Sequence, residues 1–409
     1  MDTQKSSEKD NEGRKAVMSY PTIRIPFGPQ HPFHIEPEYF MFEVDGERVV
    51  SVKPRIGYVH RGIEKAIEDR TFIQNLYLIE RICGICSHAH TTCYTQAIEE
   101  ILGVEIPPRA RFIRTIIAEL ERIHNHYLWL GLAAHEIGFE TLFMYTWRDR
   151  EIVMDLLELL SGNRVHYAMN TLGGVRRDIT PEIVEKIRKG LDALEERMRY
   201  YKKIAMTEPT ISKRANGIGI LKPKDALALC AVGPTLRASG IKRDVRADDP
   251  YIAYSEIPFN VITYDRCDVI SRLFVRCDEV FESVNIIRYA MEHLPEGKIR
   301  IKVPRRVPEG EAVSRVEAPR GELIHYAKTN GTTKPERYKV RSPTLGNIPS
   351  LCKMLVGGYI ADIPIVIAGI DPCFSCTDRM AFVNVNNNKQ WILSGEELRR
   401  YAIKWYRKE

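Results

Sequence analysis

The alternation of apolar and polar residues predicts a small β-rich region near the start of the chain. Between residues 20 and 60 the two kinds of residue alternate as they do on strands with one buried face. The step Asp45-Gly46 interrupts this alternation, and Asp-Gly is typical of the tight turn of a β-hairpin. We therefore expect a hairpin whose turn lies at Asp45-Gly46.

From about residue 62 the apolar residues recur every three or four positions, which is the period of a helix with one buried face. The step Thr180-Pro181 reads as a helix start, because proline is well suited to the first helical position. Gly162 reads as a helix end. We expect four long helices, over residues 108–124, over 139–161, from Thr180-Pro181 onward, and over 266–293.

The remaining segments show shorter patterns. Residues 208–260 are rich in glycine, proline and charge and predict loops with short elements, and β-like pieces return between Ile299 and Ile324. No repeat or linker divides residues 20–379, and residues 1–19 form a polar segment that we expect to be a disordered tail. The predicted fold class is α+β, a mainly α core of packed helices with small β regions.

Composition narrows the class of protein. With 409 residues, of which 44% are hydrophobic and 28% charged, the chain is typical of globular proteins. The formal charge of +6 is spread out, which argues against a nucleic-acid partner. The chain lacks a run of roughly 20 clean apolar residues, the length that spans a membrane, so any membrane association would come through partners.

The nine cysteines are odd in number and scattered, which favours a reducing cytosol over a secreted disulfide framework. Five of them lie in apolar or mixed contexts, and we expect them to be small core residues. These five are Cys93, Cys230, Cys267, Cys277 and Cys352.

The other four cysteines form two Cys-x-x-Cys pairs about 290 residues apart. A local zinc ribbon places its pairs within roughly 15–20 residues of each other. Four thiolates suit a soft transition metal, and a metal held by both pairs would lie at the centre of the fold, which favours a catalytic centre. The alternatives are a structural zinc site or two separate disulfides. The two motifs read Arg81-Ile-Cys83-Gly-Ile-Cys86-Ser-His-Ala-His90 and Asp371-Pro-Cys373-Phe-Ser-Cys376-Thr-Asp-Arg379.

Together these motifs resemble those of the large subunit of [NiFe]-hydrogenases, Arg-x-Cys-Gly-x-Cys-x-x-x-His and Asp-Pro-Cys-x-x-Cys-x-x-Arg, at every fixed position. The resemblance implies that all four cysteines bind nickel. Cys86 and Cys376 would also bridge to an iron that carries carbon monoxide and cyanide, while Cys83 and Cys373 would be terminal ligands. It also implies a partner small subunit with a [4Fe–4S] cluster, because the remaining cysteines of this chain are not clustered.

The resemblance extends to residues that would handle protons and charge. Cys373 would accept a proton when dihydrogen is split. Glu36, in Gly28-Pro-Gln-His-Pro-Phe-His-Ile-Glu36-Pro37, matches the glutamate that passes the proton on, although a lone glutamate in a loop is more often exposed and inert. Arg320, in Glu317-Ala-Pro-Arg-Gly, would hold a fixed positive charge over the open metal position. Asp371 would hydrogen-bond this arginine.

Two further positions come from the first motif region. His90 would donate an imidazole N–H toward a bridging sulfur, and the alternative is a satisfied core histidine. Glu64 aligns with a glutamate that in many relatives helps to bind a second cation, magnesium or iron, near the C-terminus. Arg379 stands where those relatives place a histidine ligand, which argues against a cation at Glu64.

Other segments also resemble the quinone-site subunit of respiratory complex I, among them His60-Arg61-Gly-Ile-Glu64 and Gly233-Pro-Thr-Leu-Arg237. Hydrogenases that look like complex I are the energy-converting group. They reduce protons to dihydrogen with electrons from ferredoxin, formate or carbon monoxide oxidation, and they act with ion-translocating membrane subunits. The resemblance thus implies a place at the cytoplasmic face of the cell membrane. The alternatives are a complex I-like quinone or polysulfide reductase subunit without nickel, and a non-catalytic scaffold.

Residues 380–409 follow the second motif, whereas in the resembled family this motif ends the mature protein. The resemblance implies a C-terminal assembly peptide that a maturation protease removes between Arg379 and Met380 after nickel insertion. The alternative is an ordinary terminal helix.

Overall fold

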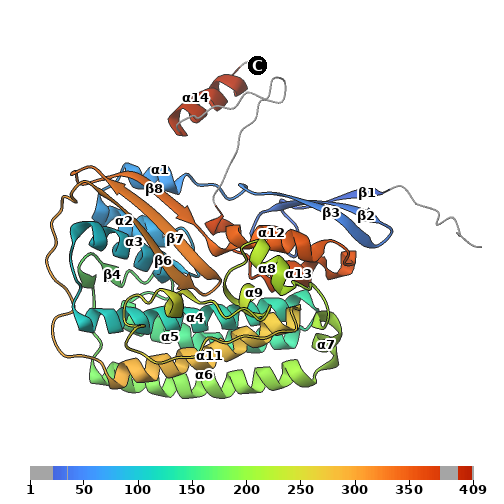
Figure 1. Cartoon of the computed structure of the whole chain (residues 1–409), viewed down its shortest axis with the longest axis horizontal. Coiled ribbons are helices and arrows are strands. Elements are labelled where there is room, and N and C mark those ends of the chain that lie inside the picture. The colour runs from blue at the N-terminus through green and yellow to red at the C-terminus, as the bar shows by residue number, and fades with distance from the viewer. Residues whose placement is uncertain (1–21, 35, 378–394, 408–409) are drawn as a thin grey trace, which may run out of the picture.

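The computed structural model describes residues 22–34, 36–377 and 395–407. Four long helices lie side by side as a bundle: α4 (Pro108–Glu136), α5 (Glu140–Ser161), α6 (Pro181–Thr207) and α11 (Val269–Glu292) (Figure 1). The apolar stripe of α6, for example Ile187 and Leu191, is fully buried against its neighbours. The four long helices that the apolar spacing predicts are therefore confirmed.

The ends of these helices follow the local sequence signals. Pro181 is the first residue of α6. Gly162 follows α5 with φ +85°, a left-handed conformation that glycine adopts without steric cost. The Asp268 side chain accepts a hydrogen bond from the backbone N–H of Ser271 at 3.0 Å and so caps α11.

The predicted hairpin near the start of the chain is present. Strands β1 (Ile23–Phe27), β2 (Tyr39–Asp45) and β3 (Arg48–Arg55) form an antiparallel sheet, and Asp45 pairs with Arg48 across the turn. Gly46 in that turn has φ +57°. This sheet shares a hydrophobic core with helices α12 (Pro343–Leu355) and α13 (Ile363–Gly369).

A second antiparallel sheet contains β6 (Gly310–Ala318), β7 (Gly321–Thr329) and β8 (Pro335–Arg341), and α3 (Ser87–Leu102) packs against it (Figure 1). Because Ala318 pairs with Gly321, Arg320 lies in the tight turn between β6 and β7. The β-like pieces predicted up to Ile324 are confirmed, whereas β8 was not predicted.

Short elements complete the fold, as predicted for residues 208–260. The fold class, mainly α with small β regions, is confirmed. The remaining elements are α1 (Ile63–Glu68), α2 (Phe72–Glu80), β4 (Asn170–Thr171), β5 (Gly174–Val175), α7 (Pro209–Ala215), α8 (Pro223–Ala228), α9 (Gly233–Arg237), α10 (Val245–Asp248), the 3₁₀ turns η1 (Ile360–Asp362) and η2 (Phe374–Cys376), and α14 (Gly395–Tyr406).

The isolated cysteines do not all lie in the core. Cys93, Cys267 and Cys277 are buried and Cys352 is half-buried, but Cys230 is exposed. The prediction is wrong for Cys230 because this residue lies in a surface turn after α8, where its backbone has φ +53°.

Candidate metal centre

The structure brings the two Cys-x-x-Cys pairs together in one buried cluster. The Sγ atoms of Cys83 and Cys373 are 3.4 Å apart, and those of Cys86 and Cys376 are 3.8 Å apart. Within the second pair, the Sγ atoms of Cys373 and Cys376 are 2.9 Å apart. Each of the four residues is at most 4% exposed. All four thiols are free, so the alternative of two separate disulfides is not what the structure shows.

Local backbone structure places three of the four thiols. Cys83 lies before α3 in a turn where its Sγ accepts from the N–H groups of Ile85 and Cys86, at 3.3 and 3.4 Å. Cys86 is the residue that directly precedes α3. The N–H of Cys373 donates to Thr344 Oγ1 at 3.0 Å, which fixes the start of the second pair.

Arg61 joins the two motifs although they are far apart in the sequence. Its guanidinium donates to the carbonyl oxygens of Arg81 and Ile82, both at 2.7 Å, and to that of Ser375 at 3.1 Å. One cation thus bridges the loop before the first pair and the turn inside the second pair.

The surroundings shift the pKa values of the thiols in different directions. Hydrogen bonds from Cys373, and then from Cys376 and Cys86, lower the pKa of the Cys83 thiol well below its ordinary value. Burial raises the pKa of the Cys376 thiol well above its ordinary value. Neighbouring thiols thus favour the thiolate of Cys83, whereas burial disfavours the thiolate of Cys376.

Arg320 and Asp371 form a rigid pair beside the cluster. Arg320 Nε donates to the Asp371 carbonyl at 2.9 Å, and Arg320 Nη2 lies 3.0 Å from Asp371 Oδ1. Asp371 has φ +54°, a left-handed conformation that aspartate tolerates better than most residues. Asn125 Nδ2 donates to the other carboxylate oxygen of Asp371 at 2.7 Å.

The charge of Arg320 is fixed. Burial opposes the charged form, but Asp371 and the neighbouring thiol Cys373 hold the pKa of this guanidinium well above its ordinary value. Arg320 Nη1 is buried and has no hydrogen-bond partner among the described residues. A buried donor without a partner costs free energy, so this atom is suited to a ligand held beside the thiols.

Two glycines allow the turn that carries Arg320 to approach α9. A Cβ at Gly321, where φ is +128°, would lie 2.7 Å from the backbone N of Gly233. A Cβ at Gly233, where φ is +67°, would lie 2.4 Å from the Arg320 carbonyl oxygen. The segments Glu317-Ala-Pro-Arg-Gly and Gly233-Pro-Thr-Leu-Arg237 therefore meet at this contact, and an ion pair of 2.7 Å between Glu317 and Arg237 holds them together.

Glu36 and His90 each contact a residue of the second motif, Ser375 and Cys376 respectively. The Glu36 carboxylate accepts from the Ser375 N–H at 2.8 Å and from the Ser375 hydroxyl. His90 Nε2 lies 3.5 Å from Cys376 Sγ. Glu36 and Asp371 also line one cavity, together with Phe33, His34, Trp129 and Phe374.

The carboxylate of Glu64 is already hydrogen-bonded within the protein. Its carboxylate accepts from Lys339 Nζ and from the Val340 N–H, each at 2.9 Å. A second cation at Glu64 would have to displace the Lys339 ammonium. Arg379 and the proposed cut after it lie outside the described residues.

The residues fit a nickel–iron group. Thiolates are the soft donors that nickel and iron accept. The Sγ atoms of Cys83, Cys86 and Cys376 lie within 4.8 Å of one another, and Cys373 Sγ adjoins those of Cys83 and Cys376. Four thiolates would also suit structural zinc. In a closed zinc site, however, all four coordination positions are filled by the protein, and no ligand remains for the unpaired Nη1 donor of Arg320. This donor therefore favours a metal site with an open position.

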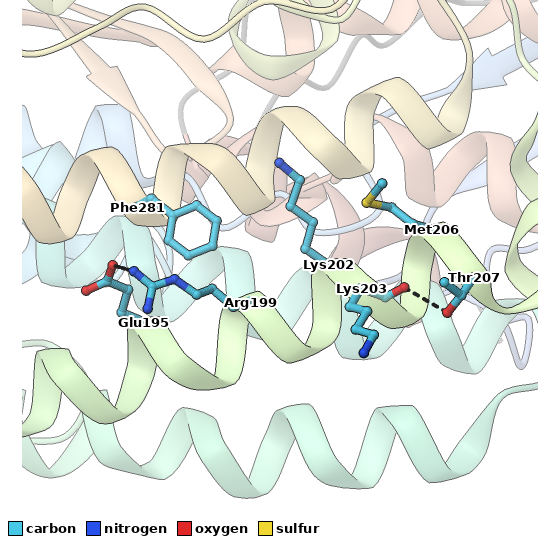
Figure 2. Close-up of a pocket in the computed structure, with 7 residues that line it drawn as sticks. All are labelled: Glu195, Arg199, Lys202, Lys203, Met206, Thr207 and Phe281. Carbon is cyan, nitrogen blue, oxygen red and sulfur yellow. Dashed lines mark hydrogen bonds and ion pairs between the residues drawn. The ribbon is translucent and has the colours of Figure 1, made fainter.

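A roomier hollow lies elsewhere. An open groove of about 520 Å³ runs between α6 and α11, and its lining residues are labelled in Figure 2. Two of its cations are already paired, Arg199 with Glu195 and Lys202 with Asp278. No thiol or imidazole lines the groove, so size alone does not identify the functional site here.

Sequence reasoning missed several side chains that hold the centre, among them Asn125, His325 and Thr344. Asn125 and Thr344 contact Asp371 and Cys373, and His325 contacts His90. Only Asn125 carried a visible signal, since the polar run His124-Asn125-His126 interrupts the apolar stripe of α4.

The chain is similar to known proteins over most of its length. Residues 136–306 and 304–379 match the family described as respiratory-chain NADH dehydrogenase, 49 Kd subunit, and residues 61–134 match the nickel-dependent hydrogenase family. The chain is 40% identical over 397 residues to the membrane-bound hydrogenase subunit alpha of Pyrococcus furiosus, and this similarity covers 93% of the chain and 92% of that protein. The chain belongs to the family of complex I-like [NiFe]-hydrogenase large subunits.

Further similarities connect this hydrogenase-family chain to membrane complexes. It is 40% identical over 380 residues to formate hydrogenlyase subunit 5 of Escherichia coli, covering 93% of the chain and 67% of that protein. In a solved structure of the membrane-bound sulfane sulfur reductase, an archaeal respiratory membrane complex, one chain superposes with a TM-score of 0.83 at 32% identity, over 88% of this chain and 98% of that one. No helix in the described part of this chain combines the length and the apolar character needed to cross a bilayer.

Proposed function

We propose that this chain is the catalytic subunit of an energy-converting [NiFe]-hydrogenase that reversibly reduces protons to dihydrogen. The observation that carries the proposal is the meeting of four buried thiols, about 290 residues apart in pairs, beside the fixed charge of Arg320. In this proposal Cys83, Cys86, Cys373 and Cys376 hold a nickel–iron group with carbon monoxide and cyanide on iron. When bound, that group supplies the redox-active metals at which electrons and protons combine.

The residues of the chain itself would handle the proton and the charge. The Cys373 sulfur is proposed to hold a proton, and the Glu36 carboxylate is proposed to exchange it with the cavity that both Glu36 and Asp371 line. The Ser375 contacts keep Glu36 next to the second cysteine pair. Arg320, oriented by Asp371 and Asn125, would stabilise negative charge at the open position.

Electrons would come from a partner small subunit with a [4Fe–4S] cluster, with ferredoxin, formate or carbon monoxide oxidation as their source. Membrane partners would couple the reaction to ion pumping at the cytoplasmic face of the membrane. The names of the relatives, which include a membrane-bound hydrogenase and a respiratory membrane complex, support an assembly of this kind. Removal of residues 380–409 by a maturation protease belongs to the same proposal.

The similarity to a sulfane sulfur reductase supports a second candidate function. In it the chain would be a quinone or polysulfide reductase subunit without nickel. Metal analysis of the purified complex separates the two functions. We expect nickel and iron at about one each per copy of this chain, beyond the iron of the partner cluster, together with dihydrogen evolution from a reduced low-potential donor. A complex that lacks nickel but reduces polysulfide would contradict the hydrogenase proposal.

A further inference from the structure

A chain of three buried side chains leads from Cys376 into the second sheet. His90 on α3, His325 on β7 and Tyr338 on β8 are each 0% exposed. His90 Nε2 lies 3.5 Å from Cys376 Sγ, and His90 Nδ1 lies 3.1 Å from His325 Nε2. His325 Nδ1 in turn lies 2.6 Å from the Tyr338 hydroxyl. Both nitrogens of each imidazole on this path therefore have a polar neighbour, and the Tyr338 hydroxyl ends the path.

The chemistry of the groups sets the direction of these hydrogen bonds. A metal-bound cysteine sulfur can only accept, so His90 must carry its proton on Nε2 to bond to Cys376. A neutral imidazole then offers Nδ1 as an acceptor, and His325 must donate to it from Nε2. The Nδ1 of His325 is left as an acceptor for the Tyr338 hydroxyl. All three donors point toward the sulfur.

The protonation states suit this arrangement. Burial, and then the neighbouring His90, lower the pKa of His325 well below its ordinary value, so this imidazole is neutral at neutral pH. Burial raises the pKa of Tyr338 well above its ordinary value, so the hydroxyl keeps its proton. A neutral acceptor and a protonated donor are what the hydrogen bond between them requires.

We propose that Tyr338 and His325 are positioning residues that fix the tautomer of His90, so that its Nε2–H donates to the sulfur of Cys376. The inference rests on the proposed function in one respect, that Cys376 binds the metals. A hydrogen bond to a ligand sulfur draws electron density away from the metal and raises its reduction potential. Two residues on the sheet would thus tune a centre that neither of them touches.

A path of this kind could also carry protons from the cluster to solvent. The geometry favours a role in positioning His90 instead. Tyr338 is fully buried, and among the described residues its hydroxyl is hydrogen-bonded only to His325. The path therefore ends inside the protein. A route to solvent would need an exposed group at its far end.

The test uses variants of the purified, metal-loaded complex. Tyr338→Phe removes only the hydroxyl, and His325→Leu removes both the donor and the acceptor of the imidazole. We expect both variants to retain nickel and iron, to move the infrared bands of carbon monoxide and cyanide to lower wavenumber, and to make the midpoint potential of the centre more negative. His325→Gln restores an N–H donor for His90, and its bands should return toward those of the parent.

A neighbouring tyrosine supplies the matched control. The ring of Tyr94 lies 5.6 Å from that of Tyr338, is equally buried, and its hydroxyl donates to the Phe72 carbonyl, outside the path. Tyr94→Phe should lower the melting temperature but leave the bands and the potential unchanged. The inference is overturned if loaded Tyr338→Phe has the bands and potential of the parent, or if Tyr94→Phe shifts them equally.

A metal-free measurement separates this inference from the proposed function. Histidine ¹⁵N signals of the full chain without metal report the tautomer of His90 directly. Among the described residues the Tyr338 hydroxyl can give its proton only to His325, so it sets the direction of the path even when Cys376 is a thiol, and we expect the His90 proton on Nε2. His325→Leu should mix in the Nδ1 form. Absence of nickel from the parent complex would contradict the proposed function alone, whereas a parent His90 protonated on Nδ1 would contradict this inference alone.

Discussion

At the scale of single residues, Glu36 shows how the chain would separate metal binding from proton transfer. Its two carboxylate oxygens accept from the N–H and the hydroxyl of Ser375, and it has no contact with a thiol of the cluster that would make it a ligand. In Glu36→Gln the amide oxygen still accepts from the N–H, and the amide nitrogen can donate to the hydroxyl oxygen. The variant should therefore keep the local fold and the metals.

Glu36→Gln should lose about 10²–10⁴-fold in turnover, the usual contribution of a positioned proton-transfer group, because an amide cannot take up and release the proton. Dihydrogen evolution and hydrogen–deuterium exchange by the metal-loaded complex measure this loss. Glu43→Gln on β2, where the carboxylate pairs with exposed Arg24, serves as the control and should be fully active. Unchanged exchange in Glu36→Gln would rule out the assigned proton route.

At the scale of secondary-structure elements, the start of α3 is capped from another helix. Cys86 stands at the N-cap position and offers no capping side chain. Instead Glu121 of α4 accepts from the N–H of His88 at 2.6 Å and from that of Ala89 at 2.9 Å. The helix start can therefore present a metal-ligating thiol because its free N–H groups are satisfied from outside.

Glu121→Leu should cost about 1–3 kcal/mol for each of the two buried N–H groups left without a partner. Because the loosened turn carries Cys86, the nickel content should fall as well. Urea unfolding and metal analysis measure the two effects. Glu100→Leu, at the exposed end of the same helix, should change neither by much. Full stability and full metal content in Glu121→Leu would show that the start of α3 does not depend on this cap.

The same helices show how far the sequence predicts the fold. Apolar spacing predicts α4 only to His124, yet the helix continues to Glu136. The run His124-Asn125-His126 interrupts the apolar stripe because these polar side chains are buried and bonded to Arg150, Asp371 and Glu279. Polar residues buried near the candidate site therefore interrupt the apolar period, and the second half of α4 is not predicted from it. Motif spacing predicts the four thiols together, whereas the contacts of Glu121, Asn125 and His325 depend on long-range packing that no local pattern encodes.

At the scale of the whole molecule, buried charges connect the bundle to the rest of the fold. Glu119 on α4 accepts from Arg122 at 3.1 Å, from Arg246 on α10 at 3.1 and 3.2 Å, and from Ser283 on α11 at 2.6 Å. Tyr254 donates to the same carboxylate. The Glu119 carboxylate is fully buried, but two arginines and two hydroxyl groups donate to it. A buried charge is tolerated when it is paired and hydrogen-bonded in this way.

This network predicts how stability depends on pH. Burial alone would raise the pKa of Glu119, but Arg122 and Arg246 outweigh it and lower the pKa to about 2. A carboxyl group whose pKa is lower in the folded state than in the unfolded one stabilises the fold above its unfolded pKa of about 4.3. That contribution, on the order of 3 kcal/mol, is lost as the pH falls from about 4.3 toward 2.

Glu119→Gln should cost about 3–5 kcal/mol at pH 7, because Arg122 and Arg246 lose their buried counter-charge. Its free energy of unfolding should then fall less steeply than that of the parent as the pH is lowered from 5 to 3, since the variant has no carboxylate to protonate at this position. Urea titrations at several pH values measure both slopes. Glu185→Gln, which breaks exposed pairs with Arg188 and Lys189 on α6, should lose at most about 1 kcal/mol and keep the slope of the parent. Parallel curves for the parent and Glu119→Gln would mean that the acid sensitivity of this fold resides in other carboxylates.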